Sequence, residues 1–290
     1  MCRSPSASVV IPTHNRAELL RDCLDSLVAL DPPGEGFEIV VADAACTDST
    51  ASLTAKVAAR QAEPAVKHLR VGTSDANAAR NAGLAAATGQ LLVLIDDDVL
   101  VPPRWLEALV AGAASWPEAE CFGGPVRPRF ESTPPRTCRD HEPAGARFEP
   151  PGPSREVDEL WGGNLAIRRA ALARVGPFRE GLPMLQEWEW EQRLLAAGGK
   201  LVFLPEAWLW HRRSAADLRL LAMVREFFLR GYLHARLDTP LASRPALRRA
   251  GGNLLHAVRG RCTRGLTETA RELGMAWGAS VERAYGKKQR

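Results

Sequence analysis

Apolar residues along the first 115 positions follow two alternating patterns. Short apolar runs typical of strands occupy residues 8–12, 37–42, 68–71 and 91–95. Apolar residues at helical spacing fill residues 16–30, 48–61, 75–88 and a segment that begins near 103. Strands that alternate with helices predict parallel strands joined by right-handed crossovers, and therefore an α/β fold. Thr13 or Asn15 is placed to cap the first helix.

The apolar run at residues 91–95 leads directly into Asp96, Asp97 and Asp98. A continuous apolar run of this kind is typical of a strand buried on both faces of a parallel sheet. Three adjacent carboxylates repel one another, and open α/β sheets bind ligands at the carboxyl ends of their strands. The pattern therefore favours a divalent cation with a phosphate-bearing ligand at this edge over a solvated acidic turn.

The second half of the chain predicts a different arrangement. Residues 125–153 contain eight prolines and predict a long irregular loop, either a lid or a disordered segment. Order resumes at residue 161, with helices near 168–174 and 186–195 and short strands at 201–205 and 208–211. Beyond residue 211 the pattern is helical only, with apolar stripes at 217–236 and 264–284. We expect one domain at residues 1–211, in two halves (1–115 and 116–211), and a helical extension at 212–290.

The net charge of +4 hides an asymmetry between these two regions. Residues 212–290 carry 17 Lys and Arg against 6 Asp and Glu, whereas residues 1–211 carry 21 against 28. A basic extension can bind nucleic acid, an anionic membrane surface or a phosphorylated substrate, or it can simply be a solvated Arg-rich face. We expect no nucleic acid partner. The apolar stripes predict either peripheral membrane contact or packing on the first domain.

Two further features bear on the compartment. No run approaches the roughly 18 apolar residues of a membrane span, and the first residues lead into strand-like sequence without a secretory signal. The six cysteines form no Cys-x-x-Cys pair, which favours reduced thiols and argues against a zinc knot. We therefore expect a cytoplasmic protein, with contact at the inner face of the membrane as an option.

Six motifs in order resemble the GT-A glycosyltransferases of family 2 over about residues 8–211. They are VVIPTHNR at 9–16, the strand that ends at Asp43, Ala79-Arg80-Asn81-x-Gly83, Ile95 to Asp98, Trp161 to Asn164, and the helix Glu187…Arg193…Gly198 followed by Pro205 and His211. The resemblance implies a GT-A (Rossmann-like) domain with a mixed, mostly parallel sheet flanked by helices. It also implies inverting transfer of a sugar from a nucleoside-diphosphate-sugar, here expected to be a UDP-sugar, to a hydroxyl of a glycan or lipid-linked acceptor.

The resemblance further implies roles for individual residues. Those expected on the donor are Pro12, Thr13, His14, Asn15, Asp43, Arg80, Asp96 and Asp97. Within this set, Asp43 would bind the base, Asp96 would face the ribose or sugar, and Asp97 is the spare carboxylate. Gly163 and Asn164 would lie beside the sugar and the acceptor. Asp98, with His211 as a further contact, would hold Mg²⁺ or Mn²⁺, cations that suit a hard oxygen site.

The general base is the role that departs most from the family pattern. Relatives usually carry Glu-Asp where this chain has Gln186-Glu187. We assign the base to Glu187, which would take the proton of the acceptor hydroxyl, and Glu189 is the alternative. Asp75 also replaces a usual glycine, which affects base binding near Arg80.

Simpler readings of these residues stay open. Asp43 can cap a helix, Arg80 can form a surface ion pair, and His211 can be structural. Glu187 can belong to a solvated acidic face, and the tryptophans at 161–210 can be core or a sugar-stacking wall. At the level of function, the alternatives are a sugar nucleotidyltransferase, whose phosphate loop is usually Gly-rich, and a non-catalytic sugar-binding relative.

Overall fold

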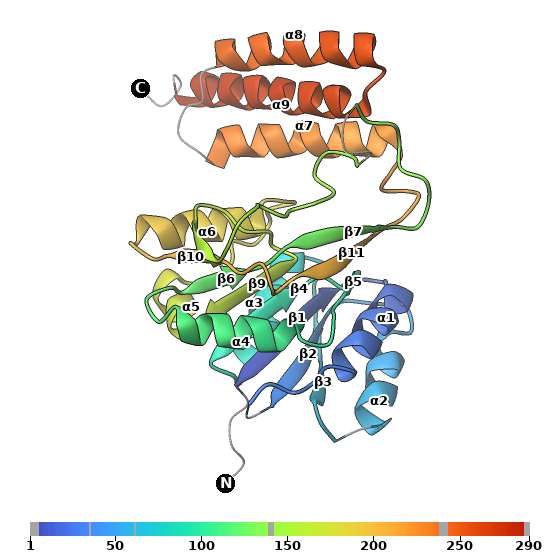
Figure 1. Ribbon diagram of the computed structural model, residues 1–290, viewed down its shortest axis with the longest axis vertical. Coiled ribbons are helices and arrows are strands. Elements are labelled where there is room, and N and C mark those ends of the chain that lie inside the picture. The colour runs from blue at the N-terminus through green and yellow to red at the C-terminus, as the bar shows by residue number, and fades with distance from the viewer. Residues whose placement is uncertain (1–5, 35, 61, 139–141, 238–242, 287–290) are drawn as a thin grey trace. The chain divides into compact units, whose positions relative to one another are not determined.

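The structure is a computed structural model that describes residues 6–34, 36–60, 62–138, 142–237 and 243–286 (Figure 1). Its contacts divide the chain into two compact units, residues 1–127 with 148–211 and residues 128–147 with 212–290. The boundary expected at residue 211 placed segment 128–147 in the first domain. In the structure this segment belongs to the helical unit, because Ala144 packs against Phe227 and Ala270.

An eight-stranded sheet forms the centre of the first unit. Its strands are β1 (Ala7–Thr13), β2 (Phe37–Ala44), β3 (Ala65–Val71), β4 (Leu91–Ile95), β6 (Cys121–Gly123), β8 (Arg155–Val157), β9 (Asn164–Arg168) and β10 (Leu201–Phe203). They lie in the order β3-β2-β1-β4-β9-β6-β10-β8. The first four are parallel, β9 is antiparallel to both neighbours, and β8 is antiparallel to β10. The predicted mixed, mostly parallel α/β sheet is confirmed.

Helices cover both faces of this sheet. One face carries α1 (Ala17–Val28), α2 (Thr50–Arg60) and α4 (Trp105–Ser115), and the other carries α3 (Ala76–Ala86), α5 (Arg169–Val175) and α6 (Gln186–Ala196). Side chains of a strand alternate between faces, so Val93 of β4 packs with the first set and Leu92 with the second. All five residues of β4 are buried, as their apolar run predicted.

The register of the sheet gathers four chain segments at one edge. Thr13 of β1 lies opposite Asp43 of β2, and Val10 lies opposite Leu94 of β4, so these parallel strands end together. Antiparallel β9 begins at this same edge, with Asn164 opposite Ile95. A small sheet of β5 (Val99–Leu100), β11 (Leu209–Arg213) and β7 (Val126–Phe130) adds His211, which pairs with Val99.

A buried carboxylate ties the opposite ends of these strands together. Glu38 of β2 accepts hydrogen bonds from the Ser8 hydroxyl (2.6 Å) and the Thr88 backbone N–H (2.6 Å), and pairs with Lys67 Nζ (2.6 Å). Burial alone would raise the pKa of Glu38, but the bonds from Lys67, Ser8 and Thr88 lower it to about 2. Glu38 therefore contributes to stability as an ion.

Helix starts follow the sequence only in part. Asp75 caps α3, accepting from the N–H groups of Asn77 and Ala78. For α1 the expected cap, Thr13 or Asn15, is wrong. The Ala17 N–H instead donates to Asp48 Oδ2 (2.9 Å), which lies 31 residues further on. Sequence reasoning considers only local caps, and this one comes from the next loop.

The second unit contains three long helices, α7 (Leu220–Leu237), α8 (Ser243–Gly260) and α9 (Thr263–Gly286). Figure 1 shows them stacked, and α9 packs against both α7 and α8. The sequence predicted α7 and α9 but missed α8. The large apolar side chains of α8, Leu247, Leu254, Leu255 and Val258, are exposed, and the residues it buries are small ones such as Ala246, Ala250 and Ala257.

The proline-rich stretch at 125–153 is not wholly irregular, because it contains β7 and a bridge between Val126 and Phe148; its residues 139–141 lie outside the described part. Within the described ranges, no helix is both long and apolar enough to cross a bilayer.

Candidate active site

The three aspartates after β4 point in different directions. Asp97 turns inward, accepting from the Thr13 hydroxyl (2.6 Å) and pairing with Arg16 Nη1 (2.7 Å). Asp98 pairs with Arg16 Nη2 (2.5 Å), while its other oxygen, Oδ1, lies 3.1 Å from His211 Nε2. Asp96 is the most exposed of the three. The acidic run is therefore a tightly turned loop in which each carboxylate has its own surroundings.

A candidate cation site lies between Asp96, Asp98 and His211, whose ligand atoms all fall within 4.8 Å of one another. Asp98 Oδ1 is buried and, among the described residues, accepts no hydrogen bond of good geometry, although His211 Nε2, itself a metal-binding atom, lies 3.1 Å away. An unsatisfied buried carboxylate oxygen is costly unless a cation completes it. Two carboxylates and an imidazole are a donor set that suits Mg²⁺ or Mn²⁺, so the residues present fit the expected ion.

The three carboxyl groups titrate in different ranges. Burial would raise the pKa of Asp98, but the neighbouring His211 and Arg16 hold it below its usual range. Burial raises the pKa of Asp97 to about 7, although Arg16 and Thr13 oppose that change. Burial and the charge of Asp98 raise the pKa of Asp96. Asp98 is therefore the carboxylate that the surroundings keep ionised, which is the form that binds a cation.

Arg80 connects this cluster to Glu187 of α6. Its Nη2 lies 2.6 Å from Glu187 Oε1 and 3.8 Å from Asp96 Oδ1, and its Nη1 donates to Asn77 Oδ1 (2.5 Å). The guanidinium is almost fully buried. The simple reading of Arg80 as a surface ion pair is wrong, because its side chain is buried between Asp96 and Glu187, two residues that are far apart in the sequence.

A pair of glycines makes room for the two acids. A Cβ on Gly162 would lie 2.2 Å from Glu187 Cδ, and one on Gly163 would lie 2.8 Å from Asp96 Oδ2. Real Cβ atoms do not tolerate such distances, so any larger residue would displace the carboxylates. The Gly162-Gly163 turn before β9 therefore sets how closely Glu187 and Asp96 approach the chain.

The acids of α6 have three different surroundings. Glu187 faces the cluster, and Glu189 pairs with Arg193 (3.0 Å). Glu191 is fully buried and accepts a hydrogen bond from the Leu160 N–H (3.3 Å). Burial raises the pKa of Glu191 well above its usual range. Of the two candidates for general base, only Glu187 lies with Asp96 and Arg80, and it is not part of a solvated face.

Asn164 is close to the cluster in sequence but enclosed in the protein. Its side chain is fully buried, accepts from Trp105 Nε1 (2.9 Å) and donates to the Ala207 carbonyl (2.7 Å). Both ends of the amide are thus engaged inside the chain. Asn164 holds the start of β9 against α4 and the loop before β11.

The residues expected around the nucleotide form a second group. Both oxygens of Asp43 are engaged, Oδ1 by the Cys46 N–H (2.6 Å) and Oδ2 by His68 Nε2 (3.0 Å). Burial would raise the pKa of Asp43, but these bonds lower it. On the neighbouring turn, which begins at Pro12, His14 Nδ1 contacts the Ala44 carbonyl (2.6 Å) and Asn15 Oδ1 accepts from the Thr47 N–H (2.7 Å).

Sequence reasoning missed three residues of the site. Arg16, which bridges Asp97 and Asp98, was quoted in a motif without a role. Asn77 orients Arg80, and Gly162 accommodates Glu187. Arg16 was the most accessible of these to prediction, since it follows the end of β1 at the same edge as the acids.

The tryptophans divide between core and surface. Trp190 is fully buried and stacks on Phe178, with ring centroids 5.6 Å apart. Trp208 packs edge-on against Trp210 (5.4 Å) and lies beneath Arg127, and Trp210 is 37% exposed. Trp190 is therefore core, whereas Trp208 and Trp210 keep the option of stacking on a sugar.

Known proteins resemble this chain in both sequence and fold. Residues 8–180 match the family model of Glycosyl transferase family 2. Glycosyltransferase AglE of Haloferax volcanii is 28% identical over 203 residues, which are 69% of this chain and 64% of that protein. The succinoglycan biosynthesis protein ExoM of Rhizobium meliloti is 29% identical over 234 residues, 78% of this chain and 72% of that one.

Other relatives are considerably longer. A validoxylamine A glucosyltransferase of Streptomyces hygroscopicus is 35% identical over 124 residues, 41% of this chain and 29% of that protein. The match thus spans less than two thirds of the Haloferax and Streptomyces proteins.

Solved structures resemble the chain over nearly its whole length. The mannosyltransferase PcManGT from Pyrobaculum calidifontis, in complex with GDP-Man and Mn²⁺, has a TM-score of 0.62 at 19% identity. The match covers 98% of this chain and 76% of the PcManGT chain. S. aureus TarS 1–349 in complex with UDP-GlcNAc has a TM-score of 0.59 at 16% identity, covering 96% and 92%. At such identities the likeness concerns the fold alone, and it confirms the predicted GT-A class.

Proposed function

The chain belongs to Glycosyl transferase family 2, and we propose that it is an inverting, divalent-metal-dependent glycosyltransferase. It would move a sugar from a nucleoside-diphosphate-sugar to a hydroxyl acceptor. One observation carries the proposal: a cluster of Asp96, Asp98 and His211 lies at the sheet edge, and Arg80 links it to Glu187.

In this proposal Asp98 and His211 hold Mg²⁺ or Mn²⁺, supported by the buried Asp98 Oδ1, which lies 3.1 Å from His211 Nε2. When bound, the cation neutralises negative charge that develops on the leaving diphosphate. Asp96, the exposed member of the triplet, faces the ribose or sugar. Asp97 positions the loop through Thr13 and Arg16 rather than contacting the donor.

Glu187 acts as general base in this scheme. The acceptor hydroxyl loses its proton to a Glu187 carboxylate oxygen while its own oxygen forms a bond to the anomeric carbon. The bond from that carbon to the diphosphate breaks on the opposite face, which inverts the configuration. Arg80 and the Gly162 turn keep the Glu187 carboxylate in place.

The nucleotide would lie along the turn at Pro12 to Asn15, with Asp43 toward the base. A UDP-sugar is our expected donor. PcManGT was solved with GDP-Man and TarS with UDP-GlcNAc, so both nucleotides belong in the first screen. Thermal stabilisation of the chain by each nucleotide-sugar, with and without Mn²⁺, identifies the donor.

The mechanism is tested by Asp98→Ala and Glu187→Gln, with Glu189→Gln as matched control on the same helix. We expect both variants to lose transfer by at least roughly a hundredfold, because a general base contributes about 10²–10⁴. Glu189 pairs with Arg193 outside the cluster, so its variant should retain activity. Full activity of Asp98→Ala or Glu187→Gln would contradict the assigned role.

Donor hydrolysis with Mn²⁺ separates the remaining alternatives. A glycosyltransferase releases a nucleoside diphosphate from its donor, whereas a non-catalytic sugar-binding relative releases none. A sugar nucleotidyltransferase would instead exchange pyrophosphate with the nucleotide-sugar. Family membership favours the first of these outcomes.

The helical unit supports a proposal about the acceptor. Leu247, Leu254, Leu255 and Val258 of α8 are 47–69% exposed at helical spacing, and the exposed Arg248 and Arg259 lie nearby in the helix. An apolar stripe beside arginines suits the surface of an anionic membrane. We propose that this stripe brings the enzyme to lipid-linked acceptors at the inner face of a membrane.

Flotation with vesicles tests this contact. The chain should float with vesicles that contain phosphatidylglycerol at low salt, and Leu255→Glu should weaken flotation. Ala55→Glu on exposed α2 makes the same charge change and should not. If the wild-type chain ignores anionic vesicles, or if both variants behave alike, the membrane proposal fails.

A further inference from the structure

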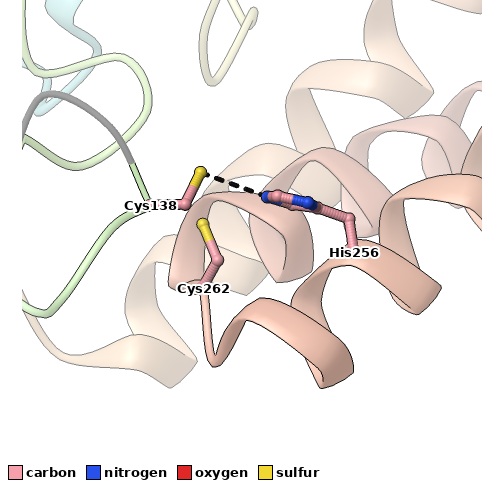
Figure 2. Close-up of side chains that lie close together, drawn as sticks. All are labelled: Cys138, His256 and Cys262. Atoms are coloured by element: carbon pink, nitrogen blue, oxygen red, sulfur yellow. Dashed lines mark hydrogen bonds between the residues drawn. The ribbon is translucent and has the colours of Figure 1, made fainter.

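A second cluster of metal-binding side chains lies in the helical unit, separate from the acidic site. It consists of Cys138, His256 and Cys262, whose ligand atoms all fall within 4.8 Å of one another. Figure 2 shows the three side chains pointing toward a common centre, with His256 Nε2 3.1 Å from Cys138 Sγ. Cys138 belongs to segment 128–147, His256 to α8, and Cys262 directly precedes α9.

Backbone contacts hold the three segments together at this point. The Thr263 N–H and hydroxyl both donate to the Arg136 carbonyl, at 3.2 and 2.9 Å. The Cys262 N–H donates to the Ala257 carbonyl (3.1 Å), which closes the end of α8. The fold of the chain thus brings the ligand atoms together, so the site is largely preformed.

Cys262 lies directly before the first residue of α9, where the helix dipole favours negative charge and therefore a thiolate. Thiolates are the form in which cysteines bind metals.

We propose that Cys138, His256 and Cys262 form a structural zinc site that fastens segment 128–147 to the α8–α9 turn. Two thiolates and an imidazole are soft and borderline ligands that select Zn²⁺ over Mg²⁺ or Mn²⁺. Two thiolates also neutralise the dication, so the site adds no charge to a unit that is already basic. Water or a further side chain completes the tetrahedron.

The sequence pattern alone argued against zinc, because it contains no Cys-x-x-Cys pair. The site escapes that rule because Cys138 lies 118 residues before His256 in the sequence. His141 follows Cys138 at Cys-x-x-His spacing in the sequence; it lies outside the described residues, and the proposed site does not count it. The proposal does not depend on the glycosyltransferase mechanism, since the acidic cluster shares none of its residues.

The test measures metal in the full chain, purified through an affinity tag that contains no histidine. We expect about one zinc per chain by mass spectrometry of the metal content. Cys138→Ser and Cys262→Ser should lose it, and His256→Ala should retain less. Replacement of zinc by Co²⁺ should produce the near-ultraviolet thiolate-to-cobalt charge-transfer band, which both serine variants should lose.

Three controls separate this site from others. His234→Ala removes another histidine of the helical unit, and Cys121→Ala removes a thiol whose pKa burial raises well above its usual range. Asp98→Asn alters the acidic cluster. All three should keep the zinc and the cobalt band. Circular dichroism shows whether each variant folds. The cobalt titration of the wild-type chain tests the site even if a variant does not fold.

Several results would overturn the proposal. One is a wild-type chain that holds no zinc and shows no thiolate band with Co²⁺. Another is a Cys138–Cys262 disulfide, found as a cross-linked peptide in chain that contains no zinc. A third is loss of the ion in Asp98→Asn, which would place it at the acidic cluster. Retention of zinc by both folded serine variants would also contradict it.

Discussion

The turn before β9 offers a direct test of how the base is positioned, through the substitution Gly162→Ala. A Cβ at this position would lie 2.2 Å from Glu187 Cδ, whereas an ordinary contact is 3.4–4 Å. The carboxyl group must therefore retreat by about 1 Å, away from its 2.6 Å contact with Arg80. Gly162 is not in the left-handed region, so alanine strains no backbone dihedral there.

The expected loss of activity follows from this displacement. A misplacement of about 1 Å in a catalytic group can cost roughly a hundredfold in rate, equivalent to about 2.7 kcal/mol of transition-state stabilisation. Overpacking should lower the free energy of unfolding by only about 1–3 kcal/mol. We expect kcat to fall roughly a hundredfold in a chain that remains folded.

Steady-state release of nucleoside diphosphate, with the donor and acceptor found by screening, measures this effect. The double variant Gly162→Ala/Glu187→Gln is the decisive comparison. If Gly162 acts through Glu187, the alanine should add little to Glu187→Gln, because the base is already lost. Gly252→Ala, on α8 with no atom within 4 Å of the added Cβ, controls for the substitution itself. The reasoning is refuted if Gly162→Ala keeps the wild-type kcat. It is also refuted if the alanine lowers kcat by the same factor in the wild-type chain and in Glu187→Gln.

Three further outcomes follow from the structure. Glu38→Gln should lower the free energy of unfolding by roughly 3 kcal/mol near pH 7. The folded pKa of Glu38, about 2, is below its usual 4.5, so this stability is present above pH 4.5 and lost toward pH 2. If urea unfolding gives the same free-energy difference between wild type and Glu38→Gln at every pH, the prediction is wrong. Asp97→Asn should leave the Mn²⁺ dependence of activity unchanged whereas Asp98→Asn abolishes it, and equal effects would show that Asp97 is no spare. Trp105→Phe removes the hydrogen-bond donor to the buried Asn164 Oδ1 and should lower the free energy of unfolding in urea by about 1–3 kcal/mol, with KM unchanged. A changed KM would indicate that Asn164 contacts substrate.

Local patterns in the sequence sufficed for most of the sheet. The apolar run of β4 predicted a strand buried on both faces, and every one of its residues is buried. The cap of α3 is also local, since Asp75 directly precedes the helix whose N–H groups it accepts from. The predicted α1 cap was wrong because Asp48 reaches the helix from another loop, and α8 was missed because the residues that it buries, such as Ala250, are small.

The candidate site shows the same division. Asp98 and His211 were each marked by a motif, and in the structure His211 Nε2 lies 3.1 Å from Asp98 Oδ1. The contacts of Arg80 with Glu187 and of Gly162 with the same carboxylate were not predictable. They depend on how α3, α6 and the turn before β9 pack, which no single segment encodes.

The sequence by itself determined the strand and helix order of the first unit, its α/β class and the acids at the edge of its sheet. Periodicity and end signals are properties of contiguous residues, so they can be read without the fold. Only the tertiary structure decided which groups share a site. Glu187 with Arg80, and Cys138 with Cys262, meet because distant segments pack together, and that packing is a property of the whole chain.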